Sequence, residues 1–271
     1  MDFPRLQALA DAAVSQMDGE DTDAAAEAER AVHGFLFRQV VATLGKRKFK
    51  RGGEVWSLLA KVAHLLPLSK AQLHQDLWVL YEHGRKRPGF FVEFGAANGM
   101  DLSNTWLLEK HFGWTGVLAE PNPDFHESLT ANRSCAISFD CVFNTTGELT
   151  PFFCTERREY SRMGAVAPED GHELKRRQVY RETMVRTVTL NDLLKRHDAP
   201  RTIDYISLDT EGSEYDILAA FDFDAWDVRL ISVEHNNTPM RGKLHDLLTR
   251  HGYARKFSEI SLFDDWYARA S

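Results

Sequence analysis

Residues 90–99 combine an apolar run, an acidic residue and two glycines, and this combination is suited to holding a ligand. The run Phe-Phe-Val-Glu-Phe predicts a buried strand, with Glu93 close to its carboxyl end. Gly95 and Gly99 predict a tight turn directly after the strand, and we expect a helix to begin near Asp101. Because glycine has no side chain, the backbone of such a turn can approach a bound molecule closely.

A second acidic residue, Glu120, closes the apolar run at residues 116–119. In a doubly wound sheet, a carboxylate in this position accepts hydrogen bonds from both ribose hydroxyls of an adenosine-containing cofactor. Gly95 and Gly99 follow a G-x-x-x-G spacing, which departs from the G-x-G-x-x-G turn that binds a pyrophosphate. We therefore expect S-adenosylmethionine, which has no phosphate, rather than NAD. The alternative is an ordinary glycine turn that joins a strand to a helix and binds nothing.

Further acidic residues extend this pattern in the second half of the chain. Asp140, Asp209 and Glu234 each follow or end a short apolar run. Ligands of open parallel sheets bind beyond the carboxyl ends of the strands, so we expect these three acids to converge there with Glu93 and Glu120. This convergence is stronger evidence for a ligand site than any single motif.

The acidic segment that starts at Asp209 reads Asp-Thr-Glu-Gly-Ser-Glu, and carboxylates this close repel one another unless a positive group lies between them. The cofactor sulfonium is one candidate, and a divalent cation such as Mg²⁺ is another. Asp209, Glu234 and His235 form a candidate metal site, although an imidazole suits transition metals better than Mg²⁺. Without a metal, we expect His235 to act as general base beside Asp209 and Glu211. The alternative is that these polar residues only stabilise the ends of helices and strands.

Composition and charge limit the class of protein. The chain has 271 residues, of which 43% are hydrophobic and 27% charged, as is ordinary for a globular protein with a sizeable core. A formal net charge of -7 argues against general nucleic-acid binding. Three cysteines without C-x-x-C spacing are typical of a reducing compartment, and the acidic N-terminus does not resemble a signal peptide. We expect a cytoplasmic protein without a transmembrane segment, because the apolar residues 55–68 are interrupted and too few to cross a bilayer.

We expect a helical extension over residues 1–70 and a cofactor-binding domain over residues 71–271. Three stretches of the extension have helical character, at residues 4–17, 32–44 and 54–66. The basic run at residues 46–51 could make weak contact with an anionic membrane surface or an acidic glycan, although a solvated loop is the more ordinary interpretation.

From residue 90 onward, short apolar runs alternate with predicted helices, and a hairpin over residues 253–267 follows. This pattern predicts an α/β fold with a seven-stranded, mostly parallel sheet and a C-terminal antiparallel hairpin, which is the Rossmann-like class I methyltransferase arrangement. Thr189 is expected to cap the helix over residues 190–197. Residues 144–188 are too many and too polar for a plain connection, so we expect an excursion over the active site.

Seven arginines of this excursion could bind an acidic or phosphorylated acceptor. They are Arg157, Arg158, Arg162, Arg176, Arg177, Arg181 and Arg186. Arginines on polar loops are usually solvated, so the alternative is that they bind no ligand.

Five segments, in this order and spacing, resemble the FkbM family of S-adenosylmethionine-dependent methyltransferases. They are QDLWVL at 75–80, FVEFGAANG at 91–99, LSNT at 102–105, LAEPN at 118–122 and IDYISLDTEGSE at 203–214. The resemblance covers about residues 70–268 and not the first 70. It implies a Rossmann-like methyltransferase fold and methylation of a hydroxyl oxygen, often on a sugar or a polyketide-type product.

The resemblance also implies roles for individual residues. Glu93 and the backbone of the Gly95–Gly99 turn would face the methionine part of the cofactor, Glu120 the ribose, and Asp140 with Cys141 the adenine; the alternative for Asp140 is that it only caps a loop. Ser103 and Asn104 are expected in the first turn of the following helix, where exposed amide groups favour polar partners. They could contact the cofactor carboxylate or simply be the residues at which the helix starts. The full set of cofactor-binding residues is Glu93, Gly95, Ala96, Asn98, Gly99, Ser103, Asn104, Glu120, Pro121, Asp140, Cys141 and Asp209.

We thus expect an S-adenosylmethionine-dependent O-methyltransferase that acts on a small-molecule or glycan hydroxyl. A homo-oligomeric state and a divalent metal as an additional cofactor are both compatible with this expectation. One rival is a nicotinamide-dependent oxidoreductase, which would need a pyrophosphate turn that the chain lacks. A second rival is a non-catalytic module that binds the cofactor and acts through a partner.

Overall fold

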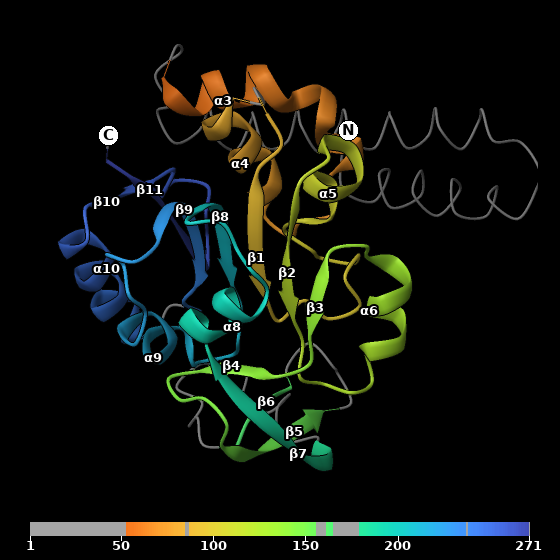
Figure 1. Ribbon diagram of the computed structural model, residues 1–271. Coiled ribbons are helices and arrows are strands. Elements are labelled where there is room, and N and C mark those ends of the chain that lie inside the picture. Colours follow the sequence, from red (N-terminus) through yellow and green to blue (C-terminus); the bar gives the residue numbers. More distant parts are fainter. Residues whose placement is uncertain (1–52, 85–86, 156–160, 165–178, 237, 271) are drawn as a thin grey trace, which may run out of the picture. The chain divides into compact units, whose positions relative to one another are not determined.

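The computed structural model describes residues 53–84, 87–155, 161–164, 179–236 and 238–270 (Figure 1). The chain divides into two units, Met1–Ser69 and Lys70–Ser271. The predicted helices at residues 4–17 and 32–44 and the basic run at residues 46–51 lie outside the described residues.

In the first unit, helix α3 covers Glu54–Val62 and the 3-10 helix η1 covers Ala63–Leu68. The α-helix that we predict over residues 54–66 therefore ends early. Pro67 lies within η1 and has no N–H group, so it cannot donate the hydrogen bond to Ala63 that would continue an α-helix. None of the helices in the described part of the chain has both the length and the apolar character that a bilayer span requires.

The second unit is built on a seven-stranded sheet of order β10-β11-β9-β8-β1-β2-β3. Its strands are β1 (Phe90–Phe94), β2 (Thr115–Ala119), β3 (Ala136–Ser138), β8 (Thr202–Leu208), β9 (Asp227–Glu234), β10 (Tyr253–Lys256) and β11 (Asp264–Arg269). Strands β3, β2, β1, β8 and β9 pair in parallel, whereas β10 and β11 form an antiparallel hairpin. The predicted mostly parallel sheet with a terminal hairpin is confirmed.

From β1 the chain builds one half of the sheet through β2 and β3, and from β8 it builds the other half in the opposite direction. The boundary between β1 and β8 is therefore a topological switch point, which is where open α/β sheets bind ligands. Phe94 of β1 pairs with Ala119 of β2 and with Leu208 of β8. The register therefore brings the residues after these strands, among them Glu120 and Asp209, out at one edge of the sheet.

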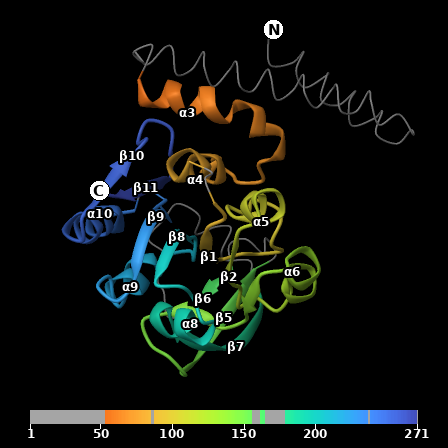
Figure 2. The ribbon, with the colours of Figure 1, turned by 45° about the horizontal axis from the view of Figure 1, so that its top comes forward.

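Helices lie on both sides of this sheet, with α4, α5 and α6 on one side and α8, α9 and α10 on the other (Figure 2). They are α4 (Gln75–His83), α5 (Trp106–Phe112), α6 (His126–Asn132), α8 (Leu190–Arg196), α9 (Glu214–Ala219) and α10 (Met240–Arg250). The core on the α8–α10 side packs leucines of these helices on alternate strand residues such as Val92, Val117 and Ile206. On the other side, Trp78 of α4 meets Tyr205 edge to face, with ring centroids 6.3 Å apart.

The helix that we predict near Asp101 begins only at Trp106. The side chain of Asn98 accepts hydrogen bonds from the backbone N–H groups of Met100 and Asp101, which closes a turn instead of a helix. Leu102 then has a φ of 60°, which is incompatible with a right-handed helix.

The excursion at residues 144–188 contributes to a second sheet of order β4-β7-β5-β6, whose strands were not predicted. Its strands are β4 (Cys141–Phe143), β5 (Leu149–Thr155), β6 (Arg162–Met163) and β7 (Val179–Thr189). One face carries a small apolar cluster of Cys141, Phe152, Cys154, Met163 and Val185. Residues 156–160 and 165–178 lie outside the described part.

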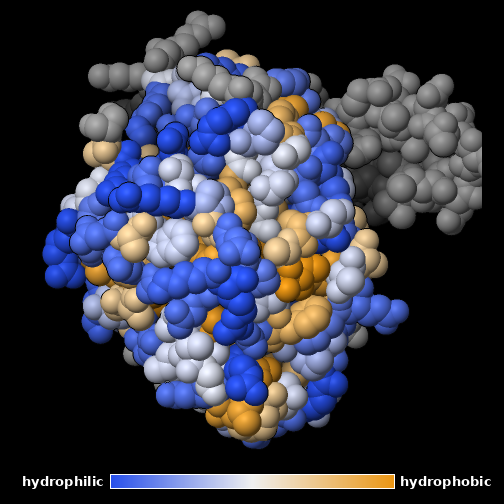
Figure 3. Space-filling view, in the orientation of Figure 1, coloured by the Kyte–Doolittle hydropathy of each residue, from blue (hydrophilic) through white to orange (hydrophobic). Residues whose placement is uncertain are grey.

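The face of the molecule shown in Figure 3 is mostly hydrophilic, with hydrophobic residues in small separate areas. Leu149 and Met184 of the second sheet are more than half exposed. Isolated exposed apolar side chains are normal on globular proteins, so we assign no function to them.

Candidate active site

A cavity opens at the switch point of the large sheet and has an empty volume of about 1110 Å³, part of which is open to solvent. Its walls come from the turn after β1, the ends of β2 and β8, the segment before α4 and the second sheet. Of the predicted site residues, those that line it are Glu93, Gly95, Ala96, Ser103, Asn104, Glu120, Pro121, Cys141, Asp209 and Glu211.

The turn after β1 requires glycine because of its backbone conformation and a close approach. Gly95 has a φ of 69°, and a Cβ atom placed on it would lie 1.9 Å from the carbonyl oxygen of Asp209. Ala97 in the same turn donates its backbone N–H to Glu120, at 2.8 Å. The absence of a side chain at Gly95 therefore lets β1 and β8 come together at the floor of the cavity.

Glu120 is a buried carboxylate in the cavity wall, with 5% of its surface exposed. Its two oxygens accept hydrogen bonds from the backbone N–H groups of Ala97 and Asn122, both at 2.8 Å. Burial raises the pKa of Glu120 to about 7, although these two hydrogen bonds oppose the shift. Each carboxylate oxygen has a further lone pair, so Glu120 can accept two more hydrogen bonds from a ligand.

Glu93 lies in the wall of the cavity, and its carboxylate is held by other side chains. It accepts hydrogen bonds from the hydroxyls of Ser103 and Thr105 and from the backbone N–H of Asn104, and it lies 3.5 Å from the guanidinium of Arg133. These contacts make Glu93 an anchor for the 103–105 segment. Its predicted contact with the methionine part of a cofactor stays a prediction.

Asn104 carries a buried polar atom without a hydrogen-bond partner among the described residues. Its Nδ2 donates to the hydroxyl of Ser207 at 2.9 Å, while its Oδ1 is buried and has no hydrogen-bond partner among the described residues. Only 9% of the residue is exposed, and it lines the cavity. A buried polar atom without a partner is costly, and a ligand donor such as an ammonium group would satisfy it.

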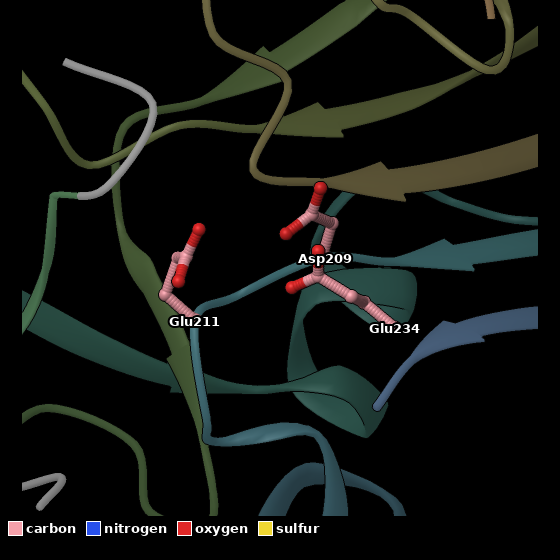
Figure 4. A group of neighbouring side chains, drawn as sticks. All are labelled: Asp209, Glu211 and Glu234. Carbon is pink, nitrogen blue, oxygen red and sulfur yellow. The ribbon is translucent and has the colours of Figure 1, made fainter. Parts of the chain in front are cut away.

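Three carboxylates meet at the ends of β8 and β9, from Asp209, Glu211 and Glu234 (Figure 4). One oxygen from each can be chosen so that all three lie within 4.8 Å of one another. Burial and the neighbouring acids raise the pKa values of Asp209 and Glu234. A set of oxygen ligands of this kind could hold a hard divalent cation such as Mg²⁺ or Ca²⁺.

His235 is not part of this group. Its Nε2 lies 3.7 Å from Oδ1 of Asp265 on β11, and burial lowers the pKa of His235. Successive side chains at a strand end point to opposite faces, so His235 faces away when Glu234 faces Asp209. The metal-ligand group in the described residues therefore contains Glu211 in place of the predicted His235. The role of His235 as a base stays a prediction, and His235 is not among the described residues that line the cavity.

Residues 93–255 match the family model of the methyltransferase FkbM domain, which is more than half of the chain. The chain belongs to the FkbM methyltransferase family. No curated protein matches it. Among solved structures, it is similar to precorrin-6Y C5,15-methyltransferase from Geobacter metallireducens GS-15, with 12% identity, a TM-score of 0.36 and coverage of 67% of this chain and 71% of that one. It is also similar to a ribosomal protein L11 methylase from Lactobacillus delbrueckii subsp. bulgaricus, with 9% identity, a TM-score of 0.38 and coverage of 72% and 75%.

Three residues predicted to bind the cofactor do not line the cavity of this FkbM domain in the described residues. Asn98 stabilises its own turn, and Gly99 packs on α6, where a Cβ atom would lie 2.6 Å from Leu129. Asp140 forms an ion pair with Arg196 of α8. This ion pair is consistent with the alternative that Asp140 stabilises a loop.

Several residues that line the cavity were not predicted as site residues. They are Gln72, Gln75, Phe152, Ser161, Met163, Thr210, Ser213 and Asp264. Asp264 accepts a hydrogen bond from Gln75 at 2.7 Å, and burial raises the pKa of Asp264 to about 7. Gln75 lies in a segment that carries the family resemblance, which was the one signal that could have identified it.

The arginines predicted to bind an acidic acceptor are only partly described. Arg162, Arg181 and Arg186 are described, and none of these three lines the cavity. Arg181 pairs with Asp124, whereas Arg162 lies over the ring of Phe153. The other four arginines lie outside the described residues.

Proposed function

We propose that this FkbM-family methyltransferase uses S-adenosylmethionine and transfers its methyl group to a hydroxyl oxygen. The observation that carries the cofactor assignment is Glu120, a buried carboxylate at the end of the second strand, oriented by the N–H groups of Ala97 and Asn122. It can accept hydrogen bonds from both ribose hydroxyls.

The remaining walls fit the other parts of the cofactor. Apolar side chains of Cys141, Val142 and Phe152 suit a flat heterocycle, and Oδ1 of Asn104 suits an ammonium group. The acids at Asp209 and Glu211 suit positive charge on sulfur. When bound, the cofactor supplies a methyl group that is already activated on a sulfonium.

The protein must orient the acceptor and remove its proton. Positioning of two reactants can supply much of the reduction in the barrier, and an alcohol needs a base because it is a weak nucleophile. Asp209 and Glu211 line the cavity, and burial next to other acids makes Asp209 a stronger base than an ordinary carboxylate. We assign proton acceptance to this pair of carboxylates.

A polyhydroxylated acceptor, such as a sugar, glycan or natural product, is part of the same proposal. The walls of the same cavity carry amide and hydroxyl groups from Gln72, Thr210 and Ser213. Such groups exchange hydrogen bonds with several hydroxyls at once.

The test combines cofactor binding with turnover. Calorimetry should show binding of S-adenosylmethionine and of its demethylated product, and a panel of sugars and hydroxylated natural products should yield that product. Binding of NAD instead would reject the proposal. Binding without turnover on any acceptor would favour a non-catalytic cofactor-binding module.

A further inference from the structure

The end of α6 lies behind the wall of the cavity and holds the turn after β1 in place. The Nδ2 of Asn132 donates to the carbonyl oxygen of Asn98 at 2.9 Å, and Nη1 of Arg133 donates to that of Gly99 at 3.1 Å. Two consecutive residues thus bind two consecutive carbonyl groups. The missing side chain at Gly99 permits this, because a Cβ atom there would lie 2.7 Å from Cγ of Arg133.

The guanidinium of Arg133 also binds the segment that follows this turn. Its Nη1 donates to the hydroxyl of Ser103 at 3.2 Å, and its Nη2 donates to that of Thr105 at 2.8 Å. The same Nη1 lies 3.5 Å from the carboxylate of Glu93. Of these partners, Glu93 and Ser103 line the cavity, whereas Arg133 does not.

A second carboxylate fixes the other side of the guanidinium. The Nε of Arg133 donates to Glu109 of α5 at 2.6 Å, and the aromatic ring of Phe91 lies 5.4 Å from Cζ. Burial alone raises the pKa of Glu109, but Arg133 and the backbone N–H of Ser134 outweigh this effect and lower it. The arginine side chain is completely buried, so its charge depends on these partners.

We infer that Arg133 is a positioning residue for cofactor binding, acting through Glu93, Ser103 and the carbonyl of Gly99. This inference rests on the proposed function, because it assigns those groups to the cofactor site. A guanidinium presents donors in a planar fork and can serve several acceptors at once, which the single ammonium of a lysine cannot do in the same geometry. Arg133→Lys therefore keeps the charge and removes the fork.

The experiment compares Arg133→Lys with Glu109→Gln, using calorimetry with the demethylated cofactor and thermal unfolding. Both variants disturb the same buried network, but Glu109 contacts only the side of the guanidinium that is remote from the cavity. We expect Arg133→Lys to raise the Kd by about tenfold or more. Glu109→Gln should lower Tm while it changes the Kd by less than about threefold.

Asn132→Ala serves as a second variant in case Arg133→Lys does not fold, since it removes one hydrogen bond to the turn. We expect it to raise the Kd by about threefold, whereas Thr130→Ala on an exposed site of the same helix should leave the Kd unchanged. A folded Arg133→Lys with wild-type affinity overturns the inference, as does wild-type affinity of Asn132→Ala if the arginine variant is unfolded. Failure of the unmutated protein to bind the probe rejects the proposed function itself.

Discussion

The carboxyl groups of Asp209 and Glu234 converge at the ends of the neighbouring parallel strands β8 and β9, where an oxygen of one lies within 4.8 Å of an oxygen of the other. Two carboxylates offer only acceptors, so a proton on one of the two groups is needed before they can form a hydrogen bond. Burial and the neighbouring acids raise both pKa values, which favours a shared proton on the pair. The pair can therefore relieve its own repulsion without a metal ion.

We accordingly expect methyl transfer to persist after removal of divalent cations, because the shared proton already compensates the crowded charges. Activity measured after dialysis against EDTA, with and without added Mg²⁺, checks this expectation. Loss of activity on chelation, with recovery on addition of Mg²⁺, would instead assign Asp209, Glu211 and Glu234 as metal ligands.

Replacement of the proposed base should slow turnover. Asp209→Asn should lower kcat by about 10² to 10⁴, the usual contribution of a positioned base. His235→Asn should change kcat by less than about threefold, because His235 lies against Asp265 and outside the cavity lining of the described residues. A large loss of kcat in the folded His235 variant would restore the histidine as the base.

Removal of the carboxylate that we propose to bind the ribose should weaken cofactor binding. We expect Glu120→Ala to raise the Kd for S-adenosylmethionine by about tenfold or more in calorimetry, because two charge-assisted hydrogen bonds are lost. Glu127→Ala, at an exposed site on α6, is the matched control. Equal affinity of the Glu120 variant and the unmutated protein would refute the assignment to the ribose.

The pH dependence of cofactor binding should follow the ionisation of the Glu120 carboxyl group. Above pH 7 the Glu120 carboxylate is ionised and can accept from both hydroxyls, whereas below its pKa of about 7 it carries a proton and loses an acceptor site. Affinity should therefore fall as the pH drops from about 8 to 6, and binding near pH 7 should release protons. Glu120→Gln should remove both effects, which calorimetry in buffers of different ionisation enthalpy can measure.

Two glycine-to-alanine substitutions can distinguish the cost of a steric clash from the cost of a positive φ angle at a residue that has a side chain. Gly95 and Gly113 both have positive φ angles, of 69° and 66°. A Cβ atom at Gly95 would clash with the backbone of Asp209, whereas a Cβ atom at Gly113 would have no neighbour within 4 Å. Gly113→Ala should lower the free energy of unfolding by about 1 kcal/mol, and Gly95→Ala by more than about 3 kcal/mol. Urea unfolding curves that show equal losses would contradict the close packing of the turn on Asp209.

Much of the fold could be predicted because strands and caps leave local patterns in a sequence. The five parallel strands follow from short apolar runs, and the predicted cap is present, since the hydroxyl of Thr189 accepts a hydrogen bond from the backbone of Asp192. The second sheet was missed because β7 exposes alternate residues such as Arg186, which makes its composition resemble that of a polar loop. Alternation along a strand with one exposed face is a weaker signal than a continuous buried apolar run.

The acids at the strand ends could be identified without coordinates, because each of them follows or closes an apolar run. Which of these residues share a site depends on how the strands pack: Glu234 meets Asp209, while His235, one residue later, lies against Asp265. Arg133 lies in no recognisable motif, and its partners come from separate segments of the chain. Contacts of that kind arise from the packing of distant segments, so local spacing carries no record of them.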